Sequence, residues 1–378
     1  MKIIKVESFA IEGRLSTPWK IATDYMKAIN AVVICVTCED GTKGYGEACA
    51  RRGANIAKPV VDELLAPIVV GKDIFDIESI WDEMYSVLRT RGHTRGFVLE
   101  AMSGIDIAIW DLVGKHLGLP INKLLFGQGR EKVPAYASSI LIDTPDKMAE
   151  EASWLCDIGY SAIKIKIAGD VQVDKNRVAA VREAIGPTAK LMLDANSGFD
   201  PTAAITFADQ IAMYDVFWLE EPVFLDNLLG YERIRESSKI RIALGEGEFT
   251  SGGFREFIRR GLVDVIQPNI TRAGGFTGVK RIAALAHSYD IPVAPHTGAS
   301  GPICMAASLQ LAAAIPGFLM YEFMYLENPF EDFFIEKQNQ PIAGHIAVPS
   351  LPGLGVNVDE KEMHKYQVAN VSVTQGSV

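Results

Sequence analysis

The chain has 378 residues, of which 48% are hydrophobic and 22% are charged, and its formal net charge is −10. This composition is typical of a soluble globular protein with one or two domains. The negative net charge argues against nucleic acid or an anionic membrane as a partner, and no apolar run reaches the roughly 20 residues that a bilayer span requires.

Residues 1–130 predict an α+β domain. Two alternating segments, MKIIKVESFAIEG and NAVVICVTCEDGTKGYGEA, are typical of strands, and the first turns polar too soon for a signal peptide. Helical patterns follow at residues 56–71, 76–92 and 97–118, and the last should end at Gly118. Strands that precede helices in this way favour an α+β arrangement.

Two of the five cysteines, Cys35 and Cys38, form a C-x-x-C motif. The motif lies in a predicted strand, where side chains three positions apart face opposite sides. No second C-x-x-C completes a zinc site. We therefore expect buried, reduced cysteines and a cytoplasmic protein.

From Val133 onward the sequence alternates between apolar runs and helical patterns. The predicted strands are residues 133–141, 161–168, 190–196, 216–222, 241–246, 263–269, 291–296 and 317–323. Eight strands with intervening helices predict a (β/α)8-type TIM barrel over residues 131–325, with the helices outside. We expect residues 326–378 to pack back onto the N-terminal domain and complete it.

Polar residues stand near the ends of six of these runs, at intervals of 23 to 28 residues from one run to the next. They are Lys164, Lys166, Asp194, Glu220, Glu246, Asn269 and His296. The C-terminal ends of barrel strands converge on one face, which carries the active site in enzymes of this fold. The spacing therefore predicts that these side chains form one site.

Lys164 and Lys166 lie two apart on one predicted strand, so their side chains share a face. Each ammonium group should lower the pKa of the other, and one of them could then act as a general base near neutral pH. The alternative is a structural ion-pair network around both lysines.

Asp194, Glu220 and Glu246 supply hard oxygen ligands of the kind that Mg²⁺ prefers, with substrate and water completing the coordination. Three unrelated surface acids are the alternative. Glu221 and Glu248 neighbour two of these residues and are expected to support the ligands or to form ion pairs.

His296 ends the seventh run and is a candidate acid or base. Glu322, in the eighth run, could donate a hydrogen bond to a developing oxyanion if it is protonated, or could be an ordinary ion-pair partner. Asn196 lies two residues beyond Asp194 and should face the same pocket.

The motifs K-I-K, D-A-N, E-E-P, G-E and P-H, in this order behind an α+β domain, resemble those of the enolase superfamily. The K-x-K motif and the histidine are similar to those of its mandelate racemase subgroup. The segment SGIDIAIWDLVGKHLGLPINKLLFG also resembles the one that leads into the barrel of that family.

The resemblance implies that Mg²⁺ and a cation bind a substrate carboxylate while a base removes the α-proton to give a stabilised enediolate. It assigns Lys166 as the base and Lys164 as the carboxylate contact. It also assigns Asp194, Glu220 and Glu246 as metal ligands, His296 as a base or acid on the other face, and Glu322 as a neighbour of the enediolate oxygen.

Asn269 departs from the family pattern, which has an aspartate paired with the histidine at this position. An amide can still accept a hydrogen bond from the imidazole N–H, but it brings no charge, so we expect a lower pKa for His296. This weakens a racemase mechanism with two bases and leaves Lys166 intact as a single base.

We therefore predict a Mg²⁺-dependent lyase that dehydrates a sugar acid, with Trp19, Tyr25, Arg51 and Arg52 of the N-terminal domain as candidate substrate contacts. A lactone cycloisomerase and a racemase or epimerase are the alternatives, and a metal-binding barrel without turnover is another. A glycosidase with Glu220 and Glu246 as its carboxylate pair would leave the lysines unexplained. The expected partners are a small carboxylate and further copies of the chain.

Overall fold

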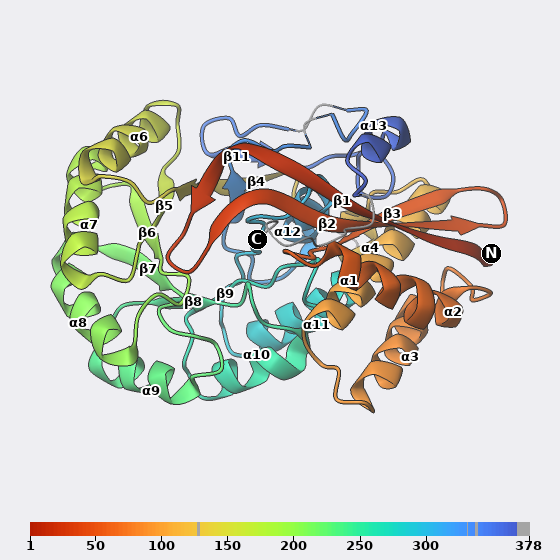
Figure 1. Cartoon of the computed structure of the whole chain (residues 1–378), viewed down its shortest axis with the longest axis horizontal. Helices are drawn as coiled ribbons and strands as arrows, with labels where there is room; N and C mark the ends of the chain where they lie inside the picture. Colours follow the sequence, from red (N-terminus) through yellow and green to blue (C-terminus); the bar gives the residue numbers. More distant parts are fainter. Residues whose placement is uncertain (127–128, 331, 337–338, 369–378) are drawn as a thin grey trace, which may run out of the picture.

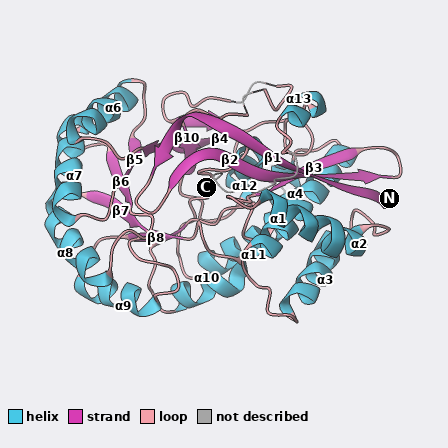
Figure 2. Cartoon of the chain, viewed as in Figure 1, coloured by secondary structure: helices cyan, strands magenta, loops and turns pink. Residues whose placement is uncertain are grey.

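The computed structural model describes residues 1–126, 129–330, 332–336 and 339–368. An N-terminal antiparallel sheet with its helices packs beside a barrel of parallel strands surrounded by helices (Figures 1 and 2). Among these residues, no helix combines the length and apolar character that a bilayer span needs.

The N-terminal sheet has the strand order β1-β2-β3 and is antiparallel. Its strands are β1 (Ile3–Lys20), β2 (Tyr25–Cys38) and β3 (Lys43–Ala48). The long hairpin of β1 and β2 extends beyond the sheet and reaches over the barrel (Figure 1). Cys35 and Cys38 lie buried and free in β2.

The helix expected at residues 56–71 is interrupted. Pro59 has no backbone N–H to donate within a helix, and a π-helical turn begins directly after it. The helical segments of this domain are α1 (Ala54–Pro59), the π-helical turn Val60–Leu65, α2 (Ala66–Val69), α3 (Ile77–Arg89) and α4 (Phe97–Leu117). Helix α4 ends at Gly118, as predicted, with a left-handed φ of 67°.

Helix α4 lies directly on β3, and two glycines permit this close approach. A Cβ atom on Gly46 would lie 1.9 Å from the carbonyl oxygen of Gly104, and one on Gly44 would lie 2.1 Å from that of Ala108. Neither position can carry a side chain without separating the helix from the sheet.

The barrel strands run parallel in the order β10-β4-β5-β6-β7-β8-β9. They are β4 (Lys132–Ile140), β5 (Ala162–Lys166), β6 (Lys190–Asp194), β7 (Val216–Glu220), β8 (Ile242–Leu244), β9 (Val265–Ile266) and β10 (Tyr321–Met324). The helices outside them are α6 (Pro145–Asp157), α7 (Val171–Ile185), α8 (Pro201–Ile211), α9 (Leu228–Ser237), α10 (Thr250–Arg259), α11 (Gly275–His287) and α12 (Pro302–Ala314). The short helix α5 (Ile121–Phe126) precedes β4.

The strand predicted at residues 291–296 is reduced to single bridges. Pro292 and Pro295 lack the N–H groups that a regular ladder needs. Val293 still bridges Ile266 of β9 and Phe318 before β10, so the ring closes at this point. The predicted barrel with its α+β domain is thereby confirmed.

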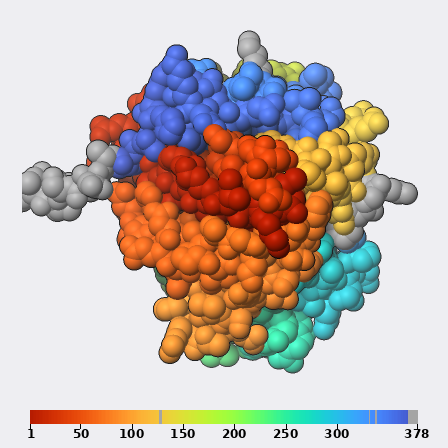
Figure 3. Space-filling view, turned by 90° about the vertical axis from the view of Figure 1, so that its right-hand side faces the viewer, coloured from red at the N-terminus to blue at the C-terminus, as the bar shows by residue number. Residues whose placement is uncertain are grey.

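The C-terminal segment lies against the N-terminal domain, above it in the space-filling view (Figure 3). It contains β11 (His345–Ala347), which pairs antiparallel with β4, and α13 (Glu360–Lys365). The backbone N–H of Val368 donates to the carbonyl oxygen of Ala10 at 2.9 Å. Residues 369–378 of the predicted C-terminal segment lie outside the described residues, and the domain boundaries at 130 and 325 stay a prediction.

A buried apolar layer fills the barrel interior below the polar strand ends. It comprises Tyr136, Ala162, Met192, Trp218, Ala243, Val265, Ala294 and Met320. The rings of Tyr136 and Trp218 meet edge to face with centroids 5.6 Å apart. This layer forms the floor beneath the inward-facing side chains that come two residues later along several strands.

Candidate active site

The inward-facing positions at the ends of β5, β6 and β7 are adjacent through strand register. Lys166 pairs with Asp194, and Asp194 pairs with Glu220. Because alternate residues of a strand share a face, Lys164 lies in the same interior one step below Lys166. The structure thus brings both lysines and two of the predicted ligands together.

Lys164 is completely buried and surrounded by acceptors. Its Nζ lies 2.9 Å from Glu220 Oε1 and 2.7 Å from Glu322 Oε1, and 5.6 Å from the centre of the Tyr136 ring. Burial alone disfavours the ammonium, but the charges of Glu220 and Glu322 outweigh it and raise the pKa of Lys164 well above its ordinary value. The expectation that neighbouring lysines depress each other's pKa is therefore wrong for Lys164.

Lys166 has a different environment. It forms an ion pair with Asp194, keeps a partly exposed side chain and lines the central cavity. Lys164, by contrast, does not line that cavity. Of the two ammonium groups, that of Lys166 is the one positioned to meet a bound molecule.

Each predicted metal ligand faces a nitrogen group. Asp194 pairs with Lys166, Glu220 with Lys164, and Glu246 Oε2 lies 2.6 Å from Nε2 of His296. Burial and the charge of Asp194 raise the pKa of Glu220 well above its usual range. Crowded carboxylates of this kind are favourable surroundings for a cation.

The pKa of Glu246 is shifted the other way. Although burial alone would raise it, His296 and Arg51 hold the pKa of Glu246 well below its usual value. Arg51 comes from the N-terminal domain, and its Nη2 lies 3.6 Å from Glu246 Oε2. Glu246 is thus the predicted ligand that joins the two domains.

The donor set fits a hard divalent cation, although the described residues contain no ready-made group of three or more histidine, cysteine, aspartate or glutamate side chains around one point. The three carboxylates turn toward their nitrogen partners instead. Asn196 Oδ1 and Gln267 Oε1 are buried oxygens without a hydrogen-bond partner beside this set. Asn196 Nδ2 lies 3.5 Å from Glu246 Oε1. Carboxylate and amide oxygens are the ligand types that Mg²⁺ selects.

Glu322 does not show the protonated state considered from the sequence. It accepts hydrogen bonds from Ser138 Oγ at 2.7 Å and from the backbone N–H of Thr297 at 2.6 Å. Burial opposes its ionisation, but Lys164 and His296 hold the pKa of Glu322 below its ordinary value. Glu322 is an ionised ion-pair partner, which is the alternative that the sequence left open.

In the contact between Asn269 and His296, the donor and acceptor roles are the reverse of those expected. The amide nitrogen of Asn269, and not its oxygen, lies 3.1 Å from His296 Nδ1. The amide oxygen accepts from the backbone N–H and from the hydroxyl of Thr271, at 2.9 and 2.6 Å. The expectation that the amide accepts from the imidazole is therefore wrong, because Thr271 occupies the oxygen.

Two of the four candidate residues from the N-terminal domain reach the site. Trp19 and Arg51 line the central cavity, whereas Tyr25 and Arg52 line a neighbouring pocket that shares Met26, Arg51 and Ala299 with it. Tyr25 is 53% exposed there. The role of all four residues as substrate contacts stays a prediction.

The central cavity has a volume of about 30 Å³, close to the share of one water molecule in the liquid. Ile21 and Met26, at the end of the β1–β2 hairpin, line it together with Trp19. A sugar acid requires more room than this volume offers.

Sequence reasoning missed several polar contacts in this region. Ser138 and Ser139 line the cavity, and Gln267 Nε2 donates to Glu220 Oε2 at 2.7 Å. The two-residue period of strands could have indicated Ser138, two positions after Tyr136, and Gln267, two positions before Asn269.

Glu221 and Glu248 lie beside the predicted ligands and have other contacts. Glu221 Oε1 accepts from the backbone N–H of Gly245 at 3.1 Å, and burial with the charge of Glu246 raises its pKa to about 8. Glu248 pairs with Arg95 of the N-terminal domain at 2.9 Å.

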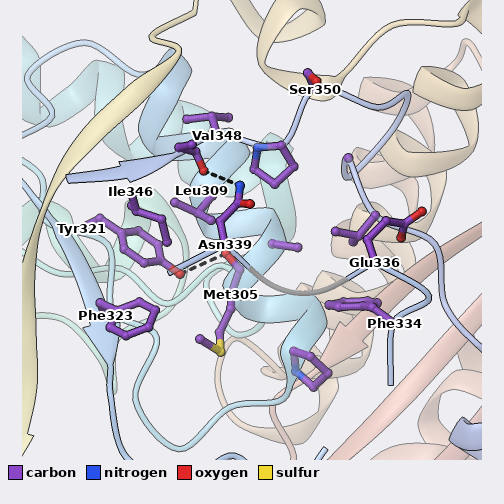
Figure 4. Close-up of a pocket in the computed structure, with 16 residues that line it drawn as sticks. Met305, Leu309, Tyr321, Phe323, Phe334, Glu336, Asn339, Ile346, Val348 and Ser350 are labelled. Carbon is purple, nitrogen blue, oxygen red and sulfur yellow. Dashed lines mark hydrogen bonds between the residues drawn. The ribbon is translucent and has the colours of Figure 1, made fainter. Parts of the chain in front are cut away.

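A second cavity, of about 360 Å³, lies between α12, β10 and the C-terminal segment (Figure 4). It is lined mainly by apolar groups, and none of the predicted site residues lines it. Two of its polar side chains bond within the lining: Asn339 Nδ2 donates to the carbonyl oxygen of Ala347 at 2.8 Å, and the Tyr321 hydroxyl donates to that of Met305 at 3.1 Å. The chemical groups therefore belong to the smaller, central cavity.

Two family models match the chain. The N-terminal domain of mandelate racemase / muconate lactonizing enzyme matches residues 3–126, and the enolase C-terminal domain-like model matches residues 147–362. Together they cover both parts of the structure described above.

Similar proteins match over nearly their whole length. D-galactarolactone cycloisomerase of Agrobacterium fabrum is 36% identical over 97% of this chain and 99% of its own. D-galactonate dehydratase of Pectobacterium atrosepticum is 30% identical over 96% and 93%. The crystal structure of 3,6-anhydro-D-galactonate cycloisomerase from Zobellia galactanivorans superposes with a TM-score of 0.87 at 32% identity, covering 98% of this chain and all of that one.

Proposed function

The chain belongs to the mandelate racemase / muconate lactonizing enzyme family of the enolase superfamily, and we propose that it removes the α-proton of a sugar acid and then expels the β-oxygen as water. It is an enzyme of the lyase and isomerase type found among its relatives. The reaction proposed here is the dehydration of a hydroxylated carboxylate.

The observation that carries this proposal is the pairing of Lys166, at the cavity, with Lys164, buried beneath it. Lys166, as the neutral amine, takes the α-proton, and the electrons of the C–H bond form a new double bond as the β-carbon–oxygen bond breaks. The ammonium formed in this way returns the proton to the departing oxygen, which leaves as water. Lys164 stays charged among its carboxylates and keeps a positive charge beneath the cavity. Trp19 and the hairpin exclude water while this happens.

Asp194, Glu220 and Glu246 would hold Mg²⁺. The ion would supply positive charge that stabilises the charge accumulating on the substrate carboxylate. In the structure, Lys164 pairs with Glu220, Lys166 pairs with Asp194, and His296 Nε2 lies 2.6 Å from Glu246 Oε2.

A lactone cycloisomerase is the second candidate. Two of the similar proteins named above are cycloisomerases, and they match this chain from end to end. Both reactions expel a β-oxygen after the same proton abstraction. They differ in whether that oxygen leaves as water or stays in the product after a ring opens.

The test is a panel of sugar acids and aldaro-lactones, incubated with the protein and Mg²⁺ in D₂O. A dehydratase yields a product one water lighter than an open acid, whereas a cycloisomerase yields an isomer of a lactone. Mass spectrometry separates the two, and a chelator should abolish either. Exchange at the α-carbon without net product would mean racemisation, and no exchange with any compound would overturn the proposal.

A further inference from the structure

The orientation of the Asn269 side chain is fixed by a backbone group. The N–H of Thr271 donates to Asn269 Oδ1 at 2.9 Å, and the Thr271 hydroxyl reaches the same oxygen at 2.6 Å. A backbone N–H can only donate, so the atom that faces it must be the amide oxygen. The other end of the side chain is therefore the NH₂ group.

This NH₂ group has two contacts, and both partners must accept. Asn269 Nδ2 lies 3.1 Å from Ser300 Oγ and 3.1 Å from His296 Nδ1. A ring nitrogen that accepts a hydrogen bond carries a lone pair and no proton. The proton of a neutral His296 ring therefore belongs on Nε2.

The opposite edge of the imidazole faces two carboxylates. His296 Nε2 lies 2.6 Å from Glu246 Oε2 and 3.8 Å from Glu322 Oε2. Glu246 is a predicted metal ligand, so the assignment stands on the Asn269 contact at Nδ1. The ring, with 2% of its surface exposed, has a donor facing Nδ1 and acceptors facing Nε2.

We propose that Asn269 holds His296 in the Nε2–H tautomer, so that His296 donates a hydrogen bond into the cavity and does not accept a proton there. Asn269 and Thr271 are positioning residues that act through the ring. A protonated Nδ1 would place two N–H groups against each other at the Asn269 contact. An aspartate at this position would accept from Nδ1–H and favour the reverse assignment.

The consequence for catalysis rests on the proposed function. Of Lys166 and His296, only Lys166 then acts as a base, and it removes the α-proton from one face of the substrate. The Nε2–H of His296, which lines the same cavity, donates a hydrogen bond to the oxygen that leaves, and the proton that completes the water comes from the Lys166 ammonium. The site exchanges the α-proton of one epimer and not of the other.

The first experiment reads the tautomer directly. Nitrogen-15 NMR of the histidine rings is recorded on the full chain, with and without Mg²⁺, and His296→Asn identifies the His296 signals among the six histidines. We expect the proton on Nε2 and a bare Nδ1. A proton on Nδ1 in the unaltered protein overturns the proposal, and this result does not depend on the folding of any variant.

Variants then test whether Asn269 sets the tautomer of His296. Asn269→Asp should place a proton on Nδ1, whereas Thr271→Val keeps the backbone donor and should leave Nδ1 bare. An Asn269→Asp protein that retains a bare Nδ1 would contradict the positioning role.

The last experiment follows α-proton exchange in D₂O for both epimers of an active substrate. The unaltered protein should exchange one epimer, and Asn269→Asp should accelerate exchange of the other at least about tenfold, since a base on that face is worth at least this much. Exchange of both epimers by the unaltered protein overturns the inference. If the NMR shows the Nε2–H tautomer but no substrate exchanges its α-proton, the inference about Asn269 is upheld. The proposed function is then refuted.

Discussion

Lys164 and Lys166 differ in environment although they lie two residues apart on β5. Lys164 is buried with Glu220 and Glu322 against it, and its raised pKa keeps it charged. Lys166 borders the cavity with Asp194 as its partner. The register of one strand thus separates a fixed positive charge from a group that can meet the substrate.

Replacing Lys166 tests whether it is the base that removes the α-proton. Lys166→Ala should remain folded and lose α-proton exchange in D₂O by at least the ~10²–10⁴-fold typical of a general base. Lys190→Ala is the matched control, because Lys190 begins the neighbouring strand at its other end and lies over the Phe217 ring. Near-full exchange by Lys166→Ala, measured by NMR, would remove Lys166 from its proposed role.

The sequence predicted the residues at the strand ends better than their charge and orientation. Spacing along the chain was enough to group Asp194 with Lys166, because barrel strand ends converge. The ionised state of Glu322 depends on Lys164, which is distant in sequence. The polarity of Asn269 depends on its contact with Thr271, which no periodicity encodes.

The packing of β3 against α4 depends on glycines, which have no side chain. Gly44 and Gly46 face the carbonyl oxygens of Ala108 and Gly104 at distances that exclude a Cβ atom. Helix α4 is buried along most of its length, so it cannot shift outward without exposing apolar surface.

Gly46→Ala should therefore destabilise the protein by about 1–3 kcal/mol, the usual cost of overpacking. Gly252→Ala in α10 is the control, because its nearest neighbour would be Thr250 Oγ1 at 3.5 Å. The control should keep its stability or gain up to about 1 kcal/mol. Urea unfolding compares the two, and equal midpoints for Gly46→Ala and the unaltered protein would contradict the packing argument.

At the level of strands and helices, the barrel could be predicted from the alternation of apolar runs and helical patterns. The strand at 291–296 is the exception, since Pro292 and Pro295 leave it with single bridges. The π-helical turn after Pro59 was equally hidden, because local hydrophobic period does not distinguish it from a continuous helix.

The two domains are joined by buried polar contacts between α4 and the beginning of α11. Trp110 Nε1 donates to Thr277 Oγ1 at 3.0 Å, and the backbone N–H of Thr277 donates to Asp106 Oδ2 at 3.0 Å. Burial raises the pKa of Asp106 to about 7. The buried contact between the domains therefore favours the protonated form of the Asp106 carboxyl group.

The stability of the whole molecule should depend on pH through Asp106. Since folding raises its pKa from 3.8 to about 7, its contribution is fully present below about pH 4 and is lost as the pH rises to about 7. The loss is on the order of 4 kcal/mol for a shift of this size. Asp106→Asn mimics the protonated group at every pH and should lose less stability over this interval.

Urea unfolding at several pH values compares Asp106→Asn with the unaltered protein. Asp157→Asn, at the exposed end of α6, controls for the removal of one negative charge. Glu47, whose pKa burial raises to about 7 as well, remains in all three proteins. Parallel pH profiles for Asp106→Asn and the unaltered protein would show that this carboxyl group is not the cause.

Trp19, Ile21 and Met26, which line the cavity, all belong to one short stretch of chain around the hairpin turn, whereas the lysines and carboxylates come from distant strands. We therefore expect that substitutions in this one stretch can change which compound binds without altering the lysines and carboxylates. Transplanting the stretch between relatives is the exchange that would test this expectation.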